Sequence, residues 1–247
     1  MLRDGPDPSY RFLPGIRAFS SGVVAATGWE IAHATLRTPV PWRDGFARIE
    51  RHLRGLGRPR TALCGIELRS PTPFTFDGFA TFNEGYRAVL GEWKILVGDD
   101  NPIPRTNVAP VMAAPGEPSL YAFACTVQGT TPAPTFVVAG AGEMRDRAQG
   151  REGIVRVGET SAEAMREKAR FVMAIMQERL SALGGAWSRV TAIEVYTAQP
   201  VHGLLDEILS PAGAAAIHGI RWFPSRPPIQ GLEFEVDLRG VARELVL

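Results

Sequence analysis

The chain has 247 residues, which is enough for one large domain or for two domains of ordinary size. Its 27 basic and 26 acidic side chains nearly cancel, so the charge gives no indication of a nucleic-acid partner or a membrane surface. The first residues, MLRDGPDPSYRF, are polar and proline-rich, unlike a signal peptide, and no apolar run reaches the roughly 18 residues of a membrane span, which together predict a cytoplasmic protein.

The first half of the chain indicates strands and helices in the order ββαβαββ. Residues 19–36 indicate two strands around the turn pair Thr27-Gly28. The next segment is amphipathic, because apolar residues recur at steps of three and four between Phe46 and Leu56, and Gly57 ends it. The elements expected after the first two strands are a helix over 42–57, a strand over 61–68, a helix over 78–93 and two strands that flank the turn at 114–118.

The second half repeats this order after a polar, proline-rich linker at 128–135. Thr160 and Glu163 form a capping-box pattern at the start of a long helix. The expected elements are a strand over 134–146, a helix over 161–183, a strand over 190–196, a short helix over 204–209, and strands over 220–223 and 232–241. We therefore predict an α+β fold of two tandem units, residues 1–128 and 134–247, each a mostly antiparallel sheet covered by two helices.

A constant offset of 127 residues relates the two halves. The helix end Leu53–Gly57 recurs as Leu180–Gly184, and the strand Ile66–Leu68 recurs as Ile193–Val195. Matches that keep one register over such a length favour a duplicated unit. The alternative is a chance match, since both stretches are an ordinary helix end followed by a strand.

Residues that bind metals or act as nucleophiles form no recognisable motif. Cys64 and Cys125 lie in apolar, strand-like runs without CxxC spacing, which indicates buried thiols. The four histidines are not at metal-ligand spacing, and the chain has no P-loop, no dinucleotide-binding glycine motif and no Ser-His-Asp order. The sequence therefore predicts no metal site.

Motifs in both halves point to one known family. In the second half these are the segment VVAGAGEMRD, the long helix that ends in LxxLG, the strand VTAIEVYT and the final GLEFEVDLRGVA. In the first half they are FATFNEGYRAVL and PRTNVAPVMAAPGEPSLYAFA. Together they resemble the RidA (YjgF) superfamily of chorismate-mutase-like units, over most of residues 30–127 and 134–244. The tandem arrangement is also similar to the chorismatases, although Ser225-Arg226-Pro227-Pro228 stands where those proteins have a Cys-Arg signature.

This resemblance implies a ring of units, formed by a homotrimer, with clefts between neighbouring units. RidA clefts hydrolyse reactive enamines and imines of 2-amino acids to 2-oxo acids and ammonia, and they need neither a metal nor an organic cofactor. The implied partner is therefore a small carboxylate-bearing substrate, and no nucleic acid or membrane.

Imine hydrolysis needs a cation that holds the substrate carboxylate and a carboxyl group that relays protons to and from water. Glu235 aligns with the catalytic glutamate of RidA proteins; the alternative is that its strand face is simply solvated. Arg226 matches the family's P-x-R pattern, and a two-residue hairpin turn at Gln230-Gly231 would place it opposite Glu235. In a register with a wider turn, Arg221 would take this role instead.

Arg105, in the motif PRTNV, matches the family arginine in the first half, where Tyr121 stands near the glutamate position. A phenol is a poor base at neutral pH. The first-half cleft therefore either binds a carboxylate without hydrolysis, or its Arg105 completes a cleft with a second-half unit. Gly140 and Gly142 lie near the family's substrate-cradling Ser-Gly, whose serine is alanine here, and Trp222 is either an apolar wall for the substrate or a core residue.

These residues support three functions. The first is hydrolytic deamination of an enamine or imine carboxylic acid, for example an aminomuconate-like unsaturated acid. The second is chorismatase-like hydrolysis of an enol-ether acid. The third is carboxylate binding without catalysis, which the missing family serine and cysteine favour. We predict the first, a metal-independent hydrolase with Glu235 and Arg226 as catalytic residues; Asn83 and Asn107 are candidate polar liners, with helix-surface and turn roles as the alternatives.

Overall fold

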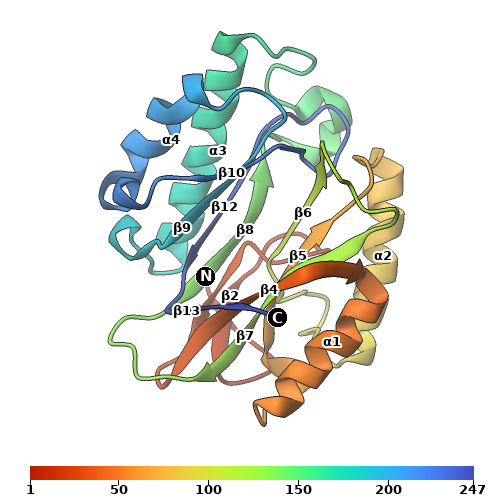
Figure 1. The fold of residues 1–247 in the computed structure, drawn as a ribbon, viewed down its shortest axis with the longest axis vertical. Helices are drawn as coiled ribbons and strands as arrows, with labels where there is room; N and C mark the ends of the chain where they lie inside the picture. Colours follow the sequence, from red (N-terminus) through yellow and green to blue (C-terminus); the bar gives the residue numbers. More distant parts are fainter.

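The computed structural model describes residues 1–247 and consists of two β-sheets that face each other, with helices on their outer faces (Figure 1). The first sheet contains, in spatial order, β11 (Ser225–Arg226), β6 (Arg105–Pro110), β5 (Leu63–Arg69), β7 (Ser119–Gln128), β4 (Trp29–Pro41) and β13 (Arg243–Val246). The second contains β1 (Arg3–Asp4), β2 (Tyr10–Leu13), β3 (Gly22–Ala25), β8 (Phe136–Gly142), β12 (Glu235–Gly240), β9 (Ala192–Tyr196) and β10 (Arg221–Phe223).

Each sheet buries its outer face under α-helices. The first sheet is covered by α1 (Trp42–Gly55) and α2 (Phe76–Glu92), and the second by α3 (Ala162–Ala182) and α4 (Leu205–Ala212). Short 3₁₀ turns are η1 (Arg60–Ala62), η2 (Arg147–Gly153), η3 (Trp187–Arg189), η4 (His202–Leu204) and η5 (Gly213–His218). The apolar stripe of each helix faces its sheet, which places the polar side in solvent. None of the helices combines the length and the hydropathy needed to cross a bilayer.

The four central strands of each sheet are connected in the same order. β4-α1-β5-α2-β6-β7 gives the strand order β6-β5-β7-β4, and β8-α3-β9-α4-β10-β12 gives the matching order β10-β9-β12-β8. In each sheet one core pair is parallel, β5 with β6 and β9 with β10, and the other core pairs are antiparallel. The predicted α+β fold of two similar, mostly antiparallel units is confirmed.

The ends of α1 and α3 have the same main-chain geometry. Gly57 and Gly184 follow the two helices with φ of +66° and +71°, a region that favours glycine. The N–H of the residue after each glycine donates to the carbonyl of Leu53 or Leu180 at 2.8 Å. The offset of 127 residues therefore relates two copies of one capping motif, while duplication of the whole unit stays a prediction.

The start of α3 differs from the predicted capping box. The Oγ of Ser161, rather than that of Thr160, accepts the N–H of Ala164 at 3.3 Å. Two hydroxyl residues stand side by side at this position, and the pattern selected the wrong one because helix ends are defined by backbone angles that a sequence does not state.

The ends of the chain cross over between the two sheets. β3 and β4 flank the predicted turn at Thr27-Gly28, yet β3 pairs with β8 of the second sheet and β4 with β7 of the first. At the other end, β13 leaves the second half and pairs in parallel with β4. The domain boundary between 128 and 134 stays a prediction, because strands at each end of the chain pair with the sheet of the other half.

The space between the sheets contains apolar and charged side chains. The apolar cluster consists of Tyr10, Phe12, Val23, Ala25, Ile31, Cys64, Ala124 and Val241. Both cysteines are buried free thiols. Beside this cluster β6 comes next to β8, where the Oγ1 of Thr106 accepts the N–H of Gly140 at 3.2 Å. The candidate site opens at this junction.

Candidate active site

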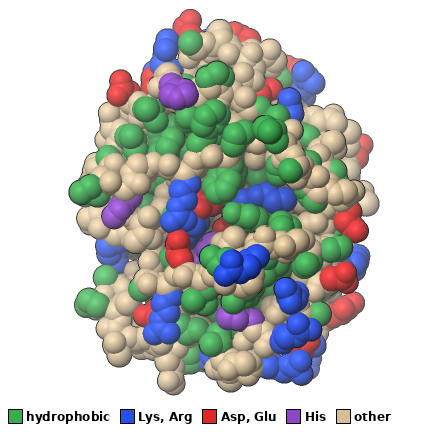
Figure 2. Space-filling model, in the orientation of Figure 1, with side chains coloured by type: hydrophobic (Ala, Val, Ile, Leu, Met, Phe, Trp, Pro, Cys, Tyr) green, Lys and Arg blue, Asp and Glu red, His purple; other side chains and the backbone are tan.

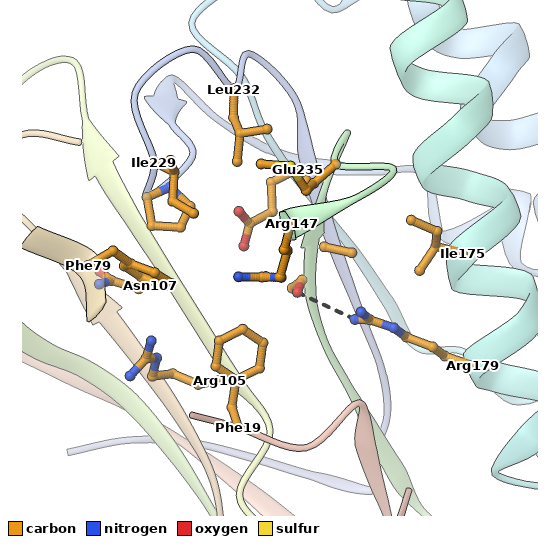
Figure 3. Close-up of a pocket in the computed structure, with 15 residues that line it drawn as sticks. Phe19, Phe79, Arg105, Asn107, Arg147, Ile175, Arg179, Ile229, Leu232 and Glu235 are labelled. Atoms are coloured by element: carbon orange, nitrogen blue, oxygen red, sulfur yellow. Dashed lines mark hydrogen bonds between the residues drawn. The ribbon is translucent and has the colours of Figure 1, made fainter. Parts of the chain in front are cut away.

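A cleft opens where β6 of the first sheet meets β8 and β12 of the second, and it encloses a cavity of about 90 Å³ (Figure 3). Its polar lining side chains are Arg105, Asn107, Arg147, Arg179 and Glu235. Its apolar walls include Phe19, Phe79, Ile175, Ile229 and Leu232. Residues from both halves therefore build one cleft inside a single chain.

Glu235 is the first residue of β12, and its carboxyl group points into the cleft (Figure 3). Its exposed fraction is 4%, so the alternative of a solvated strand face is wrong. A Cβ at Gly140 would collide with Oε1 of Glu235, so this position admits only glycine without a shift. Burial raises the pKa of Glu235 to about 8, and the charge of Glu143 adds to the rise against three arginines. Glu235 is therefore mainly protonated near neutral pH.

Arg105 lies at the closed end of the cleft and has one donor nitrogen without a partner. Nη2 donates to Oδ1 of Asn83 at 2.6 Å, which fixes the guanidinium plane. Nη1 is fully buried and bonds to nothing in the protein. Burial lowers the pKa of Arg105 to about 10, so the group is still charged at neutral pH. The guanidinium is surrounded by the rings of Phe19, Phe79, Phe82 and Tyr86.

Asn107 presents a second unused donor on the same face of β6. It lies two residues after Arg105, so the strand points both side chains to one side. Its Oδ1 accepts the hydroxyl of Ser70 at 2.9 Å, and its buried Nδ2 has no partner. Buried donors are normally bonded. Two neighbouring free N–H groups, one of them charged, therefore fit a ligand carboxylate.

Arg147 and Arg179 approach Glu235 from the opposite side (Figure 3). Arg179 on α3 donates from Nη1 to the carbonyls of Ala139, at 2.9 Å, and Gly140. Burial and the charge of Arg147 together lower the pKa of Arg179 to about 10. Arg147 begins η2 and is exposed at the cleft mouth. No carboxylate forms an ion pair with these two arginines or with Arg105, so the cleft carries excess positive charge.

The predicted pairing of Arg226 with Glu235 is wrong. Arg226 lies on β11, is exposed, and pairs with Ala109 of β6. Glu235 instead lies between Gly142 of β8 and Tyr196 of β9. The segment after Arg226 contains two prolines and runs back along Phe74, to which the carbonyl of Pro228 and the N–H of Gln230 are bonded, so no two-residue hairpin forms.

Arg221 and Trp222 also lie outside the cleft. Arg221 on β10 forms ion pairs with Glu244 at 2.9 Å and Glu194 at 3.4 Å. The indole N–H of Trp222 donates to the carbonyl of Thr197 at 3.0 Å. β9 lies between β10 and β12, so neither residue reaches Glu235. Of the other predicted residues, Arg105, Gly140, Gly142 and Glu235 line the cleft together.

Sequence reasoning missed two of the three arginines. Arg147 had a signal, because it directly follows the glycine-rich segment VVAGAGEMRD that resembles a substrate cradle. No sequence pattern marked Arg179 as a cleft residue, since a charged residue near the end of an amphipathic helix is typical of a solvated face. Its side chain turns under β8 instead and bonds to the strand's carbonyls.

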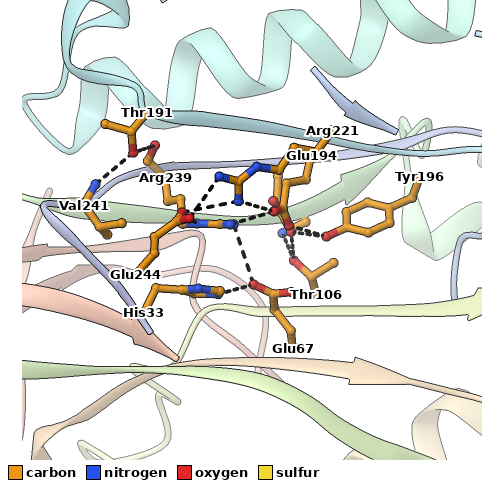
Figure 4. Close-up of polar contacts among 12 residues, drawn as sticks. His33, Glu67, Thr106, Thr191, Glu194, Tyr196, Arg221, Arg239, Val241 and Glu244 are labelled. Atoms are coloured by element: carbon orange, nitrogen blue, oxygen red, sulfur yellow. Dashed lines mark hydrogen bonds and ion pairs between the residues drawn. The ribbon is translucent and has the colours of Figure 1, made fainter. Parts of the chain in front are cut away.

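A second group of charged residues fills the space between the sheets (Figure 4). Glu67, Glu194 and Asp237 are buried with carboxylate oxygens within 4.8 Å of one another. Arg239 bonds to Glu194 at 2.7 Å, and His33 bonds to Glu67 at 2.7 Å. Figure 2 shows charged side chains gathered in a central hollow among apolar ones. Because protein cations already occupy the surroundings of these carboxylates, the residues fit an internal ion-pair network better than a metal site.

This network reaches the cleft through Thr106. The hydroxyl of Thr106 donates to Oδ2 of Asp237 at 2.6 Å and accepts the N–H of Gly140. The hydroxyl of Tyr196 also bonds to Asp237, at 3.1 Å. Burial and the neighbouring Glu194 raise the pKa of Asp237 well above its usual range. The strand β6 thus serves the cleft with Arg105 on one face and the network with Thr106 on the other.

Known proteins resemble this chain over most of its length. Residues 2–245 match the family model described as 2-aminomuconate deaminase CnbZ. The 2-amino-5-chloromuconate deaminase of Comamonas testosteroni is 41% identical over 241 residues, which cover 96% of each chain. A chorismatase structure has a TM-score of 0.48 and 15% identity over 97% of this chain and 76% of its own. The YjgF gene product of E. coli has a TM-score of 0.27 and 16% identity over 47% of this chain and 87% of its own. The family model and the relative at 41% identity show that the chain belongs to the CnbZ family of 2-aminomuconate deaminases.

Proposed function

We propose that this chain is a metal-independent hydrolytic deaminase of a 2-aminomuconate-type acid, which it converts to a 2-oxo acid and ammonia. The observation that carries the proposal is the meeting of Glu235 with three guanidinium groups that have no carboxylate partner in the protein. The activities named for the family and for the relative at 41% identity support it.

Charge balance supports a dicarboxylate substrate. Arg105 and Asn107 offer two free donors at one end of the cleft, which suits the carboxylate next to the amino-bearing carbon. Arg147 and Arg179 lie at the other side and suit the distant carboxylate. With Glu235 mainly protonated and three arginines charged, a dianion would lower the net charge of the cleft from +3 to +1.

The raised pKa of Glu235 suits the order of proton transfers. An enamine must gain a proton on carbon before water adds, and protonated Glu235 donates it to a carbon conjugated with the amino group, which leaves an iminium ion. The Glu235 carboxylate then takes a proton from water as the water oxygen attacks the iminium carbon. It returns this proton to nitrogen, the C–N bond breaks and ammonia leaves. The hydroxyl proton of the new carbonyl goes back to Glu235, so the enzyme ends as it began.

The proposal is tested with purified chain and an aminomuconate generated in situ, with ammonia release and loss of substrate absorbance as readouts. We expect Glu235→Gln to lower kcat at least about 100-fold, because the only carboxyl group that lines the cleft is lost. Arg105→Ala should raise KM, and Arg226→Ala, a change at an exposed arginine outside the cleft, should leave both constants unchanged.

Two other outcomes would contradict it. Release of pyruvate from chorismate, without ammonia from the enamine acid, would favour the chorismatase-like alternative. The second outcome is that neither substrate reacts, while muconate raises the unfolding temperature of the parent and not of Arg105→Ala. This outcome would favour carboxylate binding without catalysis.

A homotrimer stays a prediction from the RidA resemblance, and a cytoplasmic location stays a prediction from the polar N-terminal sequence and the absence of a long apolar run. The cleft takes Arg105 from the first half and Glu235 from the second half of one chain. The proposed chemistry therefore does not depend on a residue from a second copy.

A further inference from the structure

A fully buried ion pair lies next to the strand that carries Glu235. Glu143 follows β8, and Lys168 lies on α3; both side chains are 0% exposed, and the ammonium nitrogen lies 3.1 Å from Oε1. The chain contains only two lysines, and one of them is enclosed here. Because burial removes the hydration of both ions, such a pair is a weak source of stability by itself.

The same carboxylate binds the main chain that leads to Glu235. Oε1 of Glu143 accepts the N–H of Glu233 at 2.7 Å, and Oε2 accepts the N–H of Phe234 at 3.0 Å. Both amides precede β12, so strand pairing does not satisfy them. With Lys168, three donors hold the two oxygens of Glu143, and Glu143 in turn holds the two residues before Glu235.

The neighbouring residues complete a rigid unit around the cleft. Gly142, directly before Glu143, pairs with Glu235 across the strands. Leu232, directly before the bonded amides, lines the cleft and packs close to Gly142. A shift of the Glu143 carboxylate would therefore move both the wall and the acid of the cleft.

We propose that the Glu143–Lys168 pair is a positioning device that holds the entry to β12 and so aims the Glu235 carboxyl group into the cleft. The proposal rests on the function proposed above for Glu235. Neither member of the pair lines the cleft, so both act through Glu235 rather than on the substrate.

The charge of Glu143 acts on Glu235 as well. After burial it is the next cause that raises the pKa of Glu235. The charges that oppose it come from Arg105 on β6, Arg147 on η2 and Arg179 on α3. Loss of the Glu143 charge should therefore lower the pKa of Glu235, a change that a purely structural role would not cause.

The test uses Glu143→Gln, Lys168→Met and the double variant. Lys94→Met is the matched control, because Lys94 is the other lysine and is exposed after α2. We expect each pair variant to lower kcat about 10- to 100-fold, since misplacement of a catalytic group by about 1 Å has this effect. KM should change less than about threefold, because the carboxylate-binding donors are untouched.

A pH profile separates positioning from structural support. In Glu143→Gln the alkaline limb of kcat should move to lower pH, and in Lys94→Met both the limb and kcat should match the parent. The double variant leaves no unpaired buried charge, so it retains the fold even if a single variant does not, which thermal unfolding would establish.

A folded double variant with the kcat and pH profile of the parent would overturn the positioning role. Glu235→Gln distinguishes this from a failure of the proposed function. If Glu235→Gln keeps its activity, the proposed function is wrong; if it is inactive while the pair variants keep the parent kcat, only the positioning role is wrong.

Discussion

Gly140 leaves room for the carboxyl group of Glu235 because it has no side chain. Its Cα lies under the Glu235 carboxyl group, where a Cβ would collide with Oε1 and lie 3.0 Å from Oγ1 of Thr106. We predict that Gly140→Ala lowers kcat about 10- to 100-fold, because the acid is displaced. The unfolding free energy should fall by about 1–3 kcal/mol, measured by urea titration.

Gly142→Ala is the matched comparison. There the one tight contact of a Cβ would be with the end of the Leu232 side chain, at 3.0 Å, and that side chain can shift, while the carbonyl of Phe234 at 3.5 Å is an ordinary contact. Its effect on kcat should be clearly smaller than that of Gly140→Ala. An equal loss of kcat in both variants would show that kcat depends on the backbone of β8 rather than on the space over Gly140.

The pKa of Glu235 sets a pH dependence of activity and of stability. Since the protonated acid starts the proposed reaction, kcat should be constant below about pH 8 and fall as pH rises through about 8. The pKa of Glu235 is about 8 in the folded state and 4.5 ordinarily. The unfolded chain therefore ionises first, and the unfolding free energy falls as the pH rises from about 4.5 to about 8. Glu235→Gln cannot ionise and escapes this loss.

We therefore expect Glu235→Gln to be nearly inactive yet more stable than the parent at pH 8, by on the order of 2 kcal/mol. The difference should shrink towards pH 5, and thermal unfolding at several pH values measures it. A stability difference that grows as pH falls would contradict the raised pKa.

At the residue scale the sequence located one side of the cleft better than the other. Glu235, Gly140 and Gly142 share two strands of the second half, and motif order placed them together. Their roles stay predictions. Arg226 was chosen as the partner because it is near in sequence, whereas the structure brings Arg105 from 130 residues away. Alternation along a strand does not reveal which strand of another sheet lies opposite.

At the scale of elements, the two faces of β6 contact different groups of residues. Arg105 and Asn107 face the cleft, and Thr106 faces the network between the sheets. We predict that Thr106→Val costs about 1–3 kcal/mol of unfolding free energy, because the buried Asp237 loses a hydrogen-bond donor and the Gly140 N–H an acceptor. Urea unfolding measures the loss.

Thr81→Val provides the control for this change. Thr81 is exposed on α2 and bonds only to the carbonyl of Asp77 in its own helix. We expect a cost within about 0.5 kcal/mol there. A similarly small cost for Thr106→Val would mean that the network does not depend on β6.

Periodicity predicted the elements well and their pairing less well. The apolar spacing of α1 and the glycine that ends it are local features, and both appear in the structure. The sheet order requires β5 to insert between β6 and β7, and β9 between β10 and β12. Such pairing depends on burial of whole strands against helices, which short-range spacing does not encode.

At the scale of the whole molecule, the chain builds one cleft of this kind. Arg105 lies opposite Ile66 on the neighbouring strand, and Ile66 corresponds to Ile193 at the offset of 127. Since Arg221 lies opposite Glu194, the position equivalent to Arg105 in the second half is Ile220. The second junction of the two halves therefore lacks an arginine equivalent to Arg105.

We predict one dicarboxylate site per chain. Calorimetric titration with muconate, which has both carboxylates and no amino group, should give a stoichiometry of one, whatever the number of chains in the assembly. Arg105→Ala should abolish this binding, whereas Tyr121→Phe, a change outside the cleft, should not affect it. Two sites per chain, or loss of binding in Tyr121→Phe, would contradict a single cleft.

The crossing of the chain ends has a consequence for synthesis on the ribosome. The first strands to emerge, β1 to β3, have no sheet to join until β8 has been made, and the open edge of β4 remains unpaired until β13 leaves the exit tunnel. Unpaired edges are templates for aggregation. The growing polypeptide must therefore keep β1 to β3 from pairing wrongly until β8 at Phe136–Gly142 is made, and β13 at Arg243–Val246 covers the edge of β4 still later.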